Sequence, residues 1–133
     1  MARYYVDTCV WRDYSEMRGS LGKQATKFFL KVIENKDTIV FSDHLVSELR
    51  LCGCEQAFLF FEALGVLEWV NICDSDWKEA KTVSSASRVS YAECLHAIIA
   101  KKNNCILITQ NMKDFIHFKD FLVVLKPEQT LVP

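Results

Sequence analysis

The stretch YYVDTC (residues 4–9) leads from an apolar, aromatic segment directly into an acid, Asp7. The segment RYYVD (residues 3–7) is typical of a buried strand. An ionised carboxylate at the edge of a hydrophobic core is costly unless something pairs with it. The sequence therefore raises the question of what Asp7 binds, and the answer depends on what else lies at the end of this strand.

Further strands and helices alternate along the rest of the chain. Short apolar or β-branched runs predict strands at residues 38–42, 66–72, 105–109 and 121–127. Apolar residues at helical spacing predict helices at residues 22–37, 43–52, 55–64, 75–88 and 90–104, and Ser42 can cap the second of these. Residues 8–21 form a polar segment without a predicted element. This alternation predicts an α/β fold, with three α/β/α layers around a central, mainly parallel sheet.

Length and charge limit the possible classes of protein. A chain of 133 residues is expected to form a single domain over residues 1–133. Its 16 basic and 17 acidic residues give a net charge of −1, whereas nucleic-acid-binding domains are usually basic. A site that holds a divalent metal can nevertheless attract phosphates despite its acidic ligands. No segment has the length of a membrane span and no signal peptide is recognisable, so we expect a cytoplasmic protein.

The six cysteines do not have the spacing of a zinc site. CGC (residues 52–54) lacks the two-residue spacer of a zinc knuckle, and no second close pair follows it. Several of the cysteines lie within hydrophobic runs. We therefore expect free thiols that pack as small apolar side chains.

Polar turns follow two of the predicted strands. In open α/β sheets, ligand sites form outside the carboxyl ends of the strands. Asp7 lies at the carboxyl end of the first strand, and TQNMKD (residues 109–114) follows another. These two turns, distant in sequence, are therefore expected to meet at one edge of the sheet.

Three further acids lie near the ends of predicted elements, and each has an ordinary structural explanation. Glu48 lies on the border of the apolar face of its helix, where its stem can pack while its carboxylate remains hydrated. Glu93 fits a capping box with Ser90 as the cap. Asp114 lies in the first turn of a possible helix capped by Asn111, where the helix dipole favours an acid. Their joint occurrence with Asp7 is harder to explain in this way.

Clustered carboxylates raise one another's pKa unless a cation neutralises them. Hard oxygen ligands suit Mg²⁺ or Mn²⁺, which also bind phosphate oxygens. A divalent ion in such a site can activate water and stabilise in-line displacement at phosphorus. The sequence therefore predicts that Asp7 binds a metal ion and that the chemistry is cleavage of phosphodiester bonds.

Four segments together resemble the PIN-domain ribonucleases, a family that includes the VapC-type toxins. These segments, in order, are YYVDTC (4–9), SDHLVSEL (42–49), AECLHAIIA (92–100) and CILITQNMKDF (105–115). The resemblance covers nearly the whole chain. It implies a small α/β fold with a central parallel sheet, a Mg²⁺ or Mn²⁺ site and endonucleolytic cleavage of RNA. Many members form homodimers, and many are toxins neutralised by an antitoxin protein.

The resemblance also implies roles for individual residues. Asp7 and Glu48 match the first two acids of the family, and Glu93 stands where the family usually has Asp. Asn111 replaces the fourth acid, and its amide oxygen can bind a hard cation without adding charge. Asp114 lies one helical turn further on and could supply the missing carboxylate. The implied metal ligands are therefore these five residues, and the implied catalytic residues are the four acids among them.

Other polar residues near the four segments have less specific roles. Thr8 and Thr109 are expected to hydrogen-bond the acids or to cap strand ends. His96 is interpreted as a packed helical histidine with one satisfied nitrogen rather than as a general base, and no partner is predicted for His44 or His117. Basic side chains that could face phosphates are Arg12, Arg18, Lys23 and Lys113.

Two alternatives to an active ribonuclease remain at this point. Because Asn111 replaces an acid, the chain could be a catalytically degenerate PIN-like module that binds RNA or a protein. A structural subunit is the other alternative, with the aromatic helix that carries Phe58, Phe60 and Phe61 as an interface.

Overall fold

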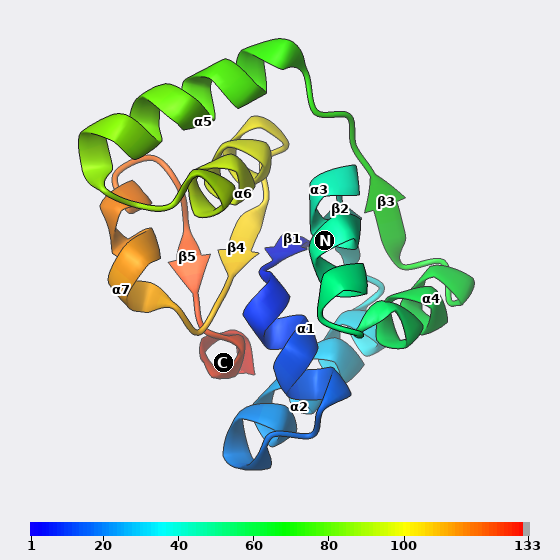
Figure 1. Cartoon of the computed structure of the whole chain (residues 1–133). Coiled ribbons are helices and arrows are strands. Elements are labelled where there is room, and N and C mark those ends of the chain that lie inside the picture. Colours follow the sequence, from blue (N-terminus) through cyan, green and yellow to red (C-terminus); the bar gives the residue numbers. More distant parts are fainter. Residues whose placement is uncertain (132–133) are drawn as a thin grey trace.

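The first strand, β1 (Arg3–Val6), is the central strand of a five-stranded sheet (Figure 1) in the computed structural model, which describes residues 1–131. β2 (Thr38–Phe41) and β4 (Ile106–Ile108) lie on its two sides. β3 (Leu67–Trp69) extends the sheet beyond β2, and β5 (Val124–Leu125) extends it beyond β4. All four pairings are parallel, as the alternation of strands and helices predicted.

Helices cover both faces of this sheet. One face carries α5 (Asp74–Ser87) and α6 (Tyr91–Lys102), and the other carries α1 (Thr8–Ser15) and α2 (Gly19–Asn35) with the short C-terminal helix η2 (Pro127–Leu131). The remaining helices are α3 (Asp43–Leu51), α4 (Glu55–Ala63), α7 (Met112–Phe115) and η1 (Ile116–Phe118). The predicted three-layer α/β/α fold is confirmed.

The helix α1 was not predicted, because residues 8–21 were interpreted as polar. Only Val10, Trp11 and Asp13 are buried among its eight residues. Three buried positions, one of them an acid, are too few to establish a helical period from the sequence. The chain therefore turns from β1 directly into a helix whose N-cap is Asp7. Helices α2 to α6 were predicted to within about three residues at each end, whereas η1 and η2 were not predicted. Several strands are shorter than predicted, since helix and strand boundaries are set by tertiary contacts.

An aromatic cluster fills the space between α1, α2 and α4. Trp11 is fully buried, and its ring lies 4.7 Å from that of Phe29, 5.7 Å from Phe61 and 6.1 Å from Phe58, measured between centroids. On α4 the buried residues are Phe58 and Phe61, whereas Phe60 is about half exposed. The predicted aromatic helix therefore contributes mainly to the core.

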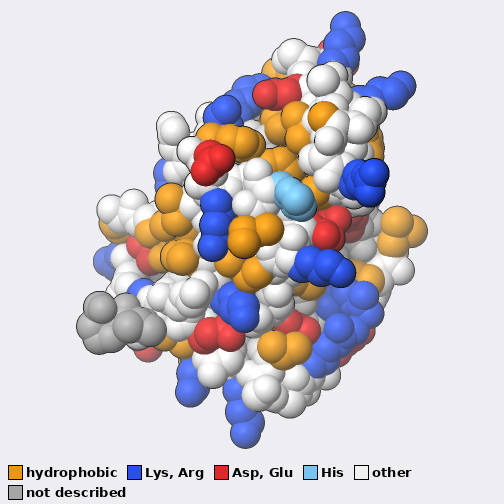
Figure 2. All heavy atoms as spheres, turned by 90° about the vertical axis from the view of Figure 1, so that its left-hand side faces the viewer, with side chains coloured by type: hydrophobic (Ala, Val, Ile, Leu, Met, Phe, Trp, Pro, Cys, Tyr) orange, Lys and Arg blue, Asp and Glu red, His pale blue; other side chains and the backbone are white. Residues whose placement is uncertain are grey.

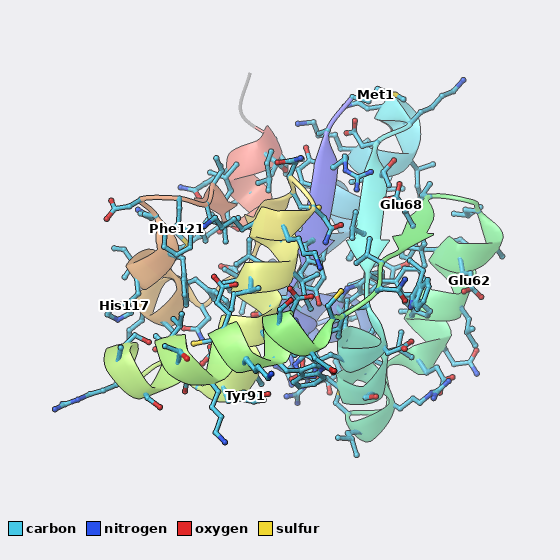
Figure 3. All side chains as sticks on the ribbon, turned by 90° about the horizontal axis from the view of Figure 1, so that it is seen from above. Met1, Glu62, Glu68, Tyr91, His117 and Phe121 are labelled. Carbon is cyan, nitrogen blue, oxygen red and sulfur yellow. The ribbon has the colours of Figure 1, made fainter. Side chains whose placement is uncertain are left out.

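The strands all point toward the same edge of the sheet. Figure 3 shows the molecule from above. Met1 lies on the side where the strands begin, and Tyr91, the first residue of α6, lies on the opposite side, where the strands end. Ser42 caps α3 and Ser90 caps α6 at this carboxyl edge, as predicted, by accepting hydrogen bonds from the backbone N–H groups of Leu45 and Glu93. Polar helix termini from distant segments are thus gathered at one edge.

All six cysteines are free. Among residues 1–131, no helix combines the length and the apolar character needed to cross a membrane.

Candidate active site

Asp7 is held where β1 and β4 leave the sheet together. Val6 pairs with Ile108, and the Asp7 N–H donates to the Ile108 carbonyl at 2.9 Å. The Asp7 carboxylate is largely buried; Oδ1 accepts from the Thr8 N–H and Oδ2 from the Thr109 hydroxyl, both at 2.8 Å. These bonds follow from the parallel register, and they fix the orientation of a carboxylate that the sequence left without a partner.

Glu48 reaches the same place from α3. Its Oε1 accepts from the Thr8 hydroxyl at 2.6 Å and from His96 Nε2 at 2.7 Å. Partial burial acts to raise the pKa of Glu48, but the hydrogen bond and charge of His96, the bond from Thr8 and the nearby His44 outweigh it and lower the pKa to about 2. Glu48 is therefore ionised over the whole physiological pH range.

His96 connects Glu48 to the interior of the sheet. It is buried on α6, and its Nδ1 lies 2.8 Å from the Tyr5 hydroxyl, which in turn lies 2.9 Å from Ser42 Oγ. Both ring nitrogens are thus satisfied, where the sequence interpretation expected one. Because an ionised carboxylate only accepts, Nε2 of His96 donates to Glu48.

Glu93 approaches from the first turn of α6, on the other side of Asp7. Its Oε1 accepts from the Ser90 hydroxyl at 2.8 Å, and its Oε2 accepts from Asn111 Nδ2 at 2.5 Å. The same amide nitrogen donates to Asp114 Oδ2 at 3.0 Å, while Asn111 Oδ1 caps α7 by accepting from the Asp114 N–H. Burial raises the pKa of Glu93, the bond from Ser90 opposes this, and the negative charges of Asp114 and Asp7 raise it further.

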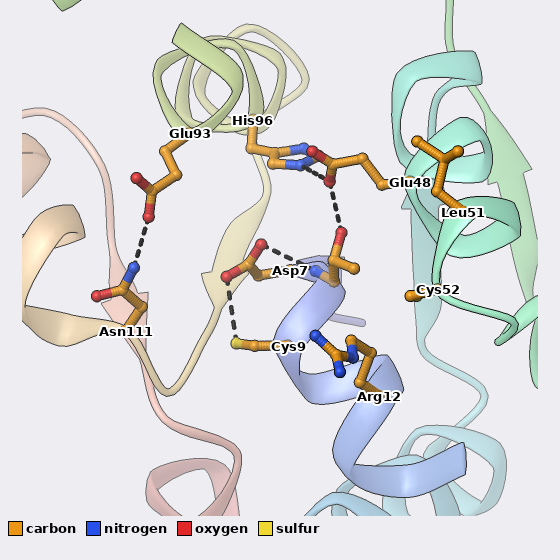
Figure 4. A pocket seen from close by; sticks show the side chains of 10 residues that line it. Asp7, Cys9, Arg12, Glu48, Leu51, Cys52, Glu93, His96 and Asn111 are labelled. Atoms are coloured by element: carbon orange, nitrogen blue, oxygen red, sulfur yellow. Dashed lines mark hydrogen bonds and ion pairs between the residues drawn. The ribbon is translucent and has the colours of Figure 1, made fainter. Parts of the chain in front are cut away.

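These side chains surround one pocket (Figure 4) of about 420 Å³. In the close-up, Glu93 and Asn111 lie on one side of Asp7, Glu48 and His96 on the other, and Arg12 points toward it from α1. The residues that line the pocket are Asp7, Thr8, Cys9, Arg12, Glu48, Leu51, Cys52, Glu93, His96 and Asn111. Four segments that are far apart in sequence therefore contribute polar groups to one cavity.

The family model of the PIN domain matches residues 4–120 of the chain. The chain belongs to the PIN-domain family. This match covers all four of the segments that resembled the family, and it confirms the family expected from them.

Solved structures share the fold of this PIN domain over nearly its whole length. They include VapBC-1 from nontypeable Haemophilus influenzae (18% identity, 94% of this chain and 98% of that one, TM-score 0.67). VapBC2 from Rickettsia felis, bound to a DNA fragment from the promoter, is 18% identical over 92% of this chain and 96% of that one, with a TM-score of 0.66. A toxin–antitoxin complex from Klebsiella pneumoniae is 18% identical over 96% of this chain and 98% of that one, with a TM-score of 0.60. No curated protein sequence is significantly similar to the chain.

Sequence reasoning missed several contacts in and around this site of the PIN domain. Arg12 was only one of four basic candidates, and it alone of these lines the pocket. His44 had no predicted partner, yet its Nε2 lies 3.6 Å from Glu48 Oε2. The spacing of four residues between His44 and Glu48 on a predicted helix is a signal that would have paired them. No signal in the sequence pairs His96 with Glu48, because that contact depends on how α3 and α6 pack.

The donor atoms of this pocket fit a hard divalent cation. Asp7, Glu48 and Glu93 offer carboxylate oxygens, the ligands that Mg²⁺ and Mn²⁺ prefer. Burial is the main cause of the raised pKa of Glu93, and the negative charges of Asp114 and Asp7 raise it further. A cation between the acids would relieve the repulsion among them. The amide nitrogen of Asn111 already relieves part of this repulsion, since it donates hydrogen bonds to both Glu93 and Asp114.

Glu48→Gln is expected to lower the free energy of unfolding at pH 7 by about 1–2 kcal/mol, after allowance for solvent screening. The depressed pKa means that ionised Glu48 stabilises the fold above its ordinary pKa of 4.5, and that this contribution is lost as pH falls from 4.5 toward 2. Urea unfolding of the wild type and the variant between pH 7 and pH 3 measures the difference. The difference should shrink below pH 4.5, and one that stays constant to the acid end would contradict this assignment.

Proposed function

We propose that this chain is a metal-dependent endoribonuclease that hydrolyses RNA phosphodiester bonds at the pocket around Asp7. The observation that carries the proposal is the convergence of Asp7, Glu48 and Glu93 on one cavity at the carboxyl edge of the sheet, in a chain of the PIN-domain family. We assign residues 1–133 to a single PIN-like domain, of which the family model matches residues 4–120.

Three residues would hold the cation directly: Asp7, Glu48 and Glu93. A bound Mg²⁺ or Mn²⁺ supplies a Lewis acid for the phosphate and an acidified water as nucleophile. The sequence also predicted Asn111 and Asp114 as ligands. Their contacts favour a positioning role, since the Asn111 amide nitrogen holds Glu93 and bonds to Asp114, while its oxygen caps α7.

The two threonines predicted as supporting residues orient the acids. Thr8 donates its N–H to Asp7 and its hydroxyl to Glu48, so one residue fixes the spacing between these two carboxylates. Thr109 donates its hydroxyl to Asp7 and accepts from the Asn111 N–H at 2.9 Å, which couples the β4 end to β1. Preorganised ligands of this kind do not need to reorganise when charge develops during the reaction.

Arg12 is the side chain best placed to bind a phosphate of the substrate. It lines the pocket, and the one ion pair that it forms within the described part of the chain, with Glu16, is long at 3.6 Å. On the face beyond α7, Figure 2 shows Lys and Arg side chains interspersed with acidic and hydrophobic ones. We therefore propose that the cation and Arg12, rather than a broad basic face, attract the RNA backbone.

The partners of this chain follow from its relatives. The similar solved structures include a toxin–antitoxin complex from Klebsiella pneumoniae, and we propose that this chain is the toxin of such a pair, bound by an antitoxin protein. We further propose a homodimer and a cytoplasmic location, where an RNA substrate is available. These assignments depend on the same cleavage activity.

Cleavage of RNA by the purified protein in the presence of Mn²⁺ tests the proposed function. We expect new RNA ends to appear with Mn²⁺ and none after chelation of the metal with EDTA, because the carboxylates alone cannot activate water at phosphorus. Cleavage that continues unchanged in excess EDTA would contradict a metal-dependent reaction.

A degenerate PIN module that binds RNA or a protein without cutting is the alternative function. It is favoured by Asn111, which replaces an acidic residue of the family and brings no charge to the site. Retention of RNA in a filter-binding assay with Mn²⁺, together with the absence of any cleavage product, would support this alternative and overturn the first proposal.

A further inference from the structure

His44 and two residues that line the pocket, Glu48 and His96, form a cluster of potential metal ligands. His44 and Glu48 lie four residues apart on α3, so their side chains share one face of the helix. His96 faces them from α6: its Nε2 lies 2.7 Å from Glu48 Oε1, and His44 Nε2 lies 3.6 Å from Glu48 Oε2. One donor atom from each of the three residues falls within a group whose members are all within 4.8 Å of one another.

Among residues 1–131, His44 Nε2 has no hydrogen-bond partner, although the atom is buried. The ring is held in place by its neighbours, with its centroid 4.6 Å from that of His96 and 5.9 Å from that of Trp77. A buried polar atom without a partner is costly, and its presence in a folded protein requires an explanation. A ligand that accepts the lone pair of this nitrogen would supply the missing interaction.

We infer that His44, Glu48 and His96 form a binding site for a transition-metal ion of the Zn²⁺ and Co²⁺ class. Two imidazole nitrogens and one carboxylate suit these ions, whereas Mg²⁺ prefers oxygen ligands. Nitrogen ligands at 2.0–2.1 Å from a tetrahedral ion lie about 3.3 Å apart. The distances from Glu48 to the two histidines, 2.7 and 3.6 Å, are within a fraction of an ångström of that value.

The residues behind His96 allow it to serve as a ligand. A metal requires an unprotonated Nε2, so the ring proton must then lie on Nδ1 and be accepted by a neighbour. Nδ1 faces the Tyr5 hydroxyl, which is followed by Ser42 Oγ. A hydroxyl can both donate and accept a hydrogen bond. Tyr5 can therefore accept a hydrogen bond from Nδ1–H of His96 and donate one to Ser42 Oγ without movement of heavy atoms.

This site differs from the proposed Mg²⁺ or Mn²⁺ site in its ligands and shares only Glu48 with it. Asp7 and Glu93 belong to the carboxylate site, whereas His44 does not line the pocket. Three protein ligands leave a fourth position for water or another donor, as in catalytic zinc sites. Glu48 thus links the two ions, so occupation of one site changes the ligands available to the other.

Spectroscopic titration of the purified protein with Co²⁺ tests this inference without any measurement of activity. The wild type is expected to bind one equivalent with the visible ligand-field bands of a four- or five-coordinate ion. Zn²⁺ should displace it at one equivalent, and millimolar Mg²⁺ should not. His44→Ala and His44→Phe should both weaken Co²⁺ binding at least about tenfold, and circular dichroism checks that both variants fold. Tenfold is the smallest loss of affinity that is typical when a residue supporting a metal ligand is removed, and loss of a ligand itself should cost at least as much.

Matched controls separate this site from the rest of the protein. His117→Ala removes an exposed histidine and should leave the titration unchanged. Asp7→Asn should retain the Co²⁺ bands, so the result does not depend on the proposed nuclease site. The inference fails if the wild type gives no such bands, if they persist in both His44 variants, if they vanish in Asp7→Asn, or if thiolate charge-transfer bands show that a cysteine holds the ion.

Discussion

Asp7→Asn is expected to reduce Mn²⁺-dependent RNA cleavage by at least about 100-fold, equivalent to about 2.7 kcal/mol of transition-state stabilisation. The substitution keeps the volume of the side chain but removes the negative charge at the centre of the proposed site. It also places an amide N–H near two groups that now donate to the carboxylate, the Thr8 N–H and the Thr109 hydroxyl. The rate of product formation from RNA under single-turnover conditions measures the effect.

The matched control for this variant is Asp120→Asn, which removes the same charge from an exposed position near the end of η1. It should cleave RNA at the wild-type rate. If Asp7→Asn retained activity within about threefold of the wild type, about 0.7 kcal/mol, the carboxylate would not be part of the reaction centre.

Trp11→Ala is expected to lower the free energy of unfolding by about 3–5 kcal/mol, which is typical when a buried tryptophan is replaced by alanine. Trp11 is fully buried and, together with Tyr14, makes the aromatic contacts of α1 with α2 and α4. The loss would leave a cavity beneath the helix that begins at Asp7. Chemical denaturation followed by circular dichroism measures it, and the midpoint of thermal unfolding should fall by about 10 °C or more.

Two variants calibrate this result. Trp69→Ala changes a tryptophan that is 49% exposed and should cost no more than about 1 kcal/mol. Trp11→Phe keeps an aromatic ring in the cluster and removes the indole Nε1, which is buried and has no hydrogen-bond partner among the residues that the structure describes. It should therefore cost less than half as much as Trp11→Ala. Equal destabilisation by Trp11→Ala and Trp69→Ala would contradict the view that α1 is anchored by the aromatic cluster.

The sheet and most helices could be predicted because each has a local signal. β-branched and apolar runs marked the strands, and Ser42 and Ser90 marked the beginnings of α3 and α6. The helix α1 escaped prediction because its burial depends on a distant partner: Trp11 is apolar in a polar segment, and only the packing of Phe29 and Phe58 around it explains the helix. Local periodicity carries no information about such a partner.

The candidate site was predictable to a similar degree. Asp7 and Thr109 follow neighbouring parallel strands, and the rule that such ends share an edge of the sheet brings them together. The Thr109 hydroxyl does contact Asp7. The bridge from Asn111 to Glu93 and the contact of His96 with Glu48 were not predictable, because both depend on the angle at which α6 crosses the sheet.

The most direct test of the central claim is a calorimetric titration of the purified protein with Mn²⁺, carried out on the wild type and on Asp7→Asn. The claim is that Asp7, Glu48 and Glu93 bind one divalent cation in their common pocket. It predicts saturable binding by the wild type at millimolar Mn²⁺ or below, and loss of that binding in the variant. Absence of binding by the wild type, or equal binding by both proteins, would contradict it.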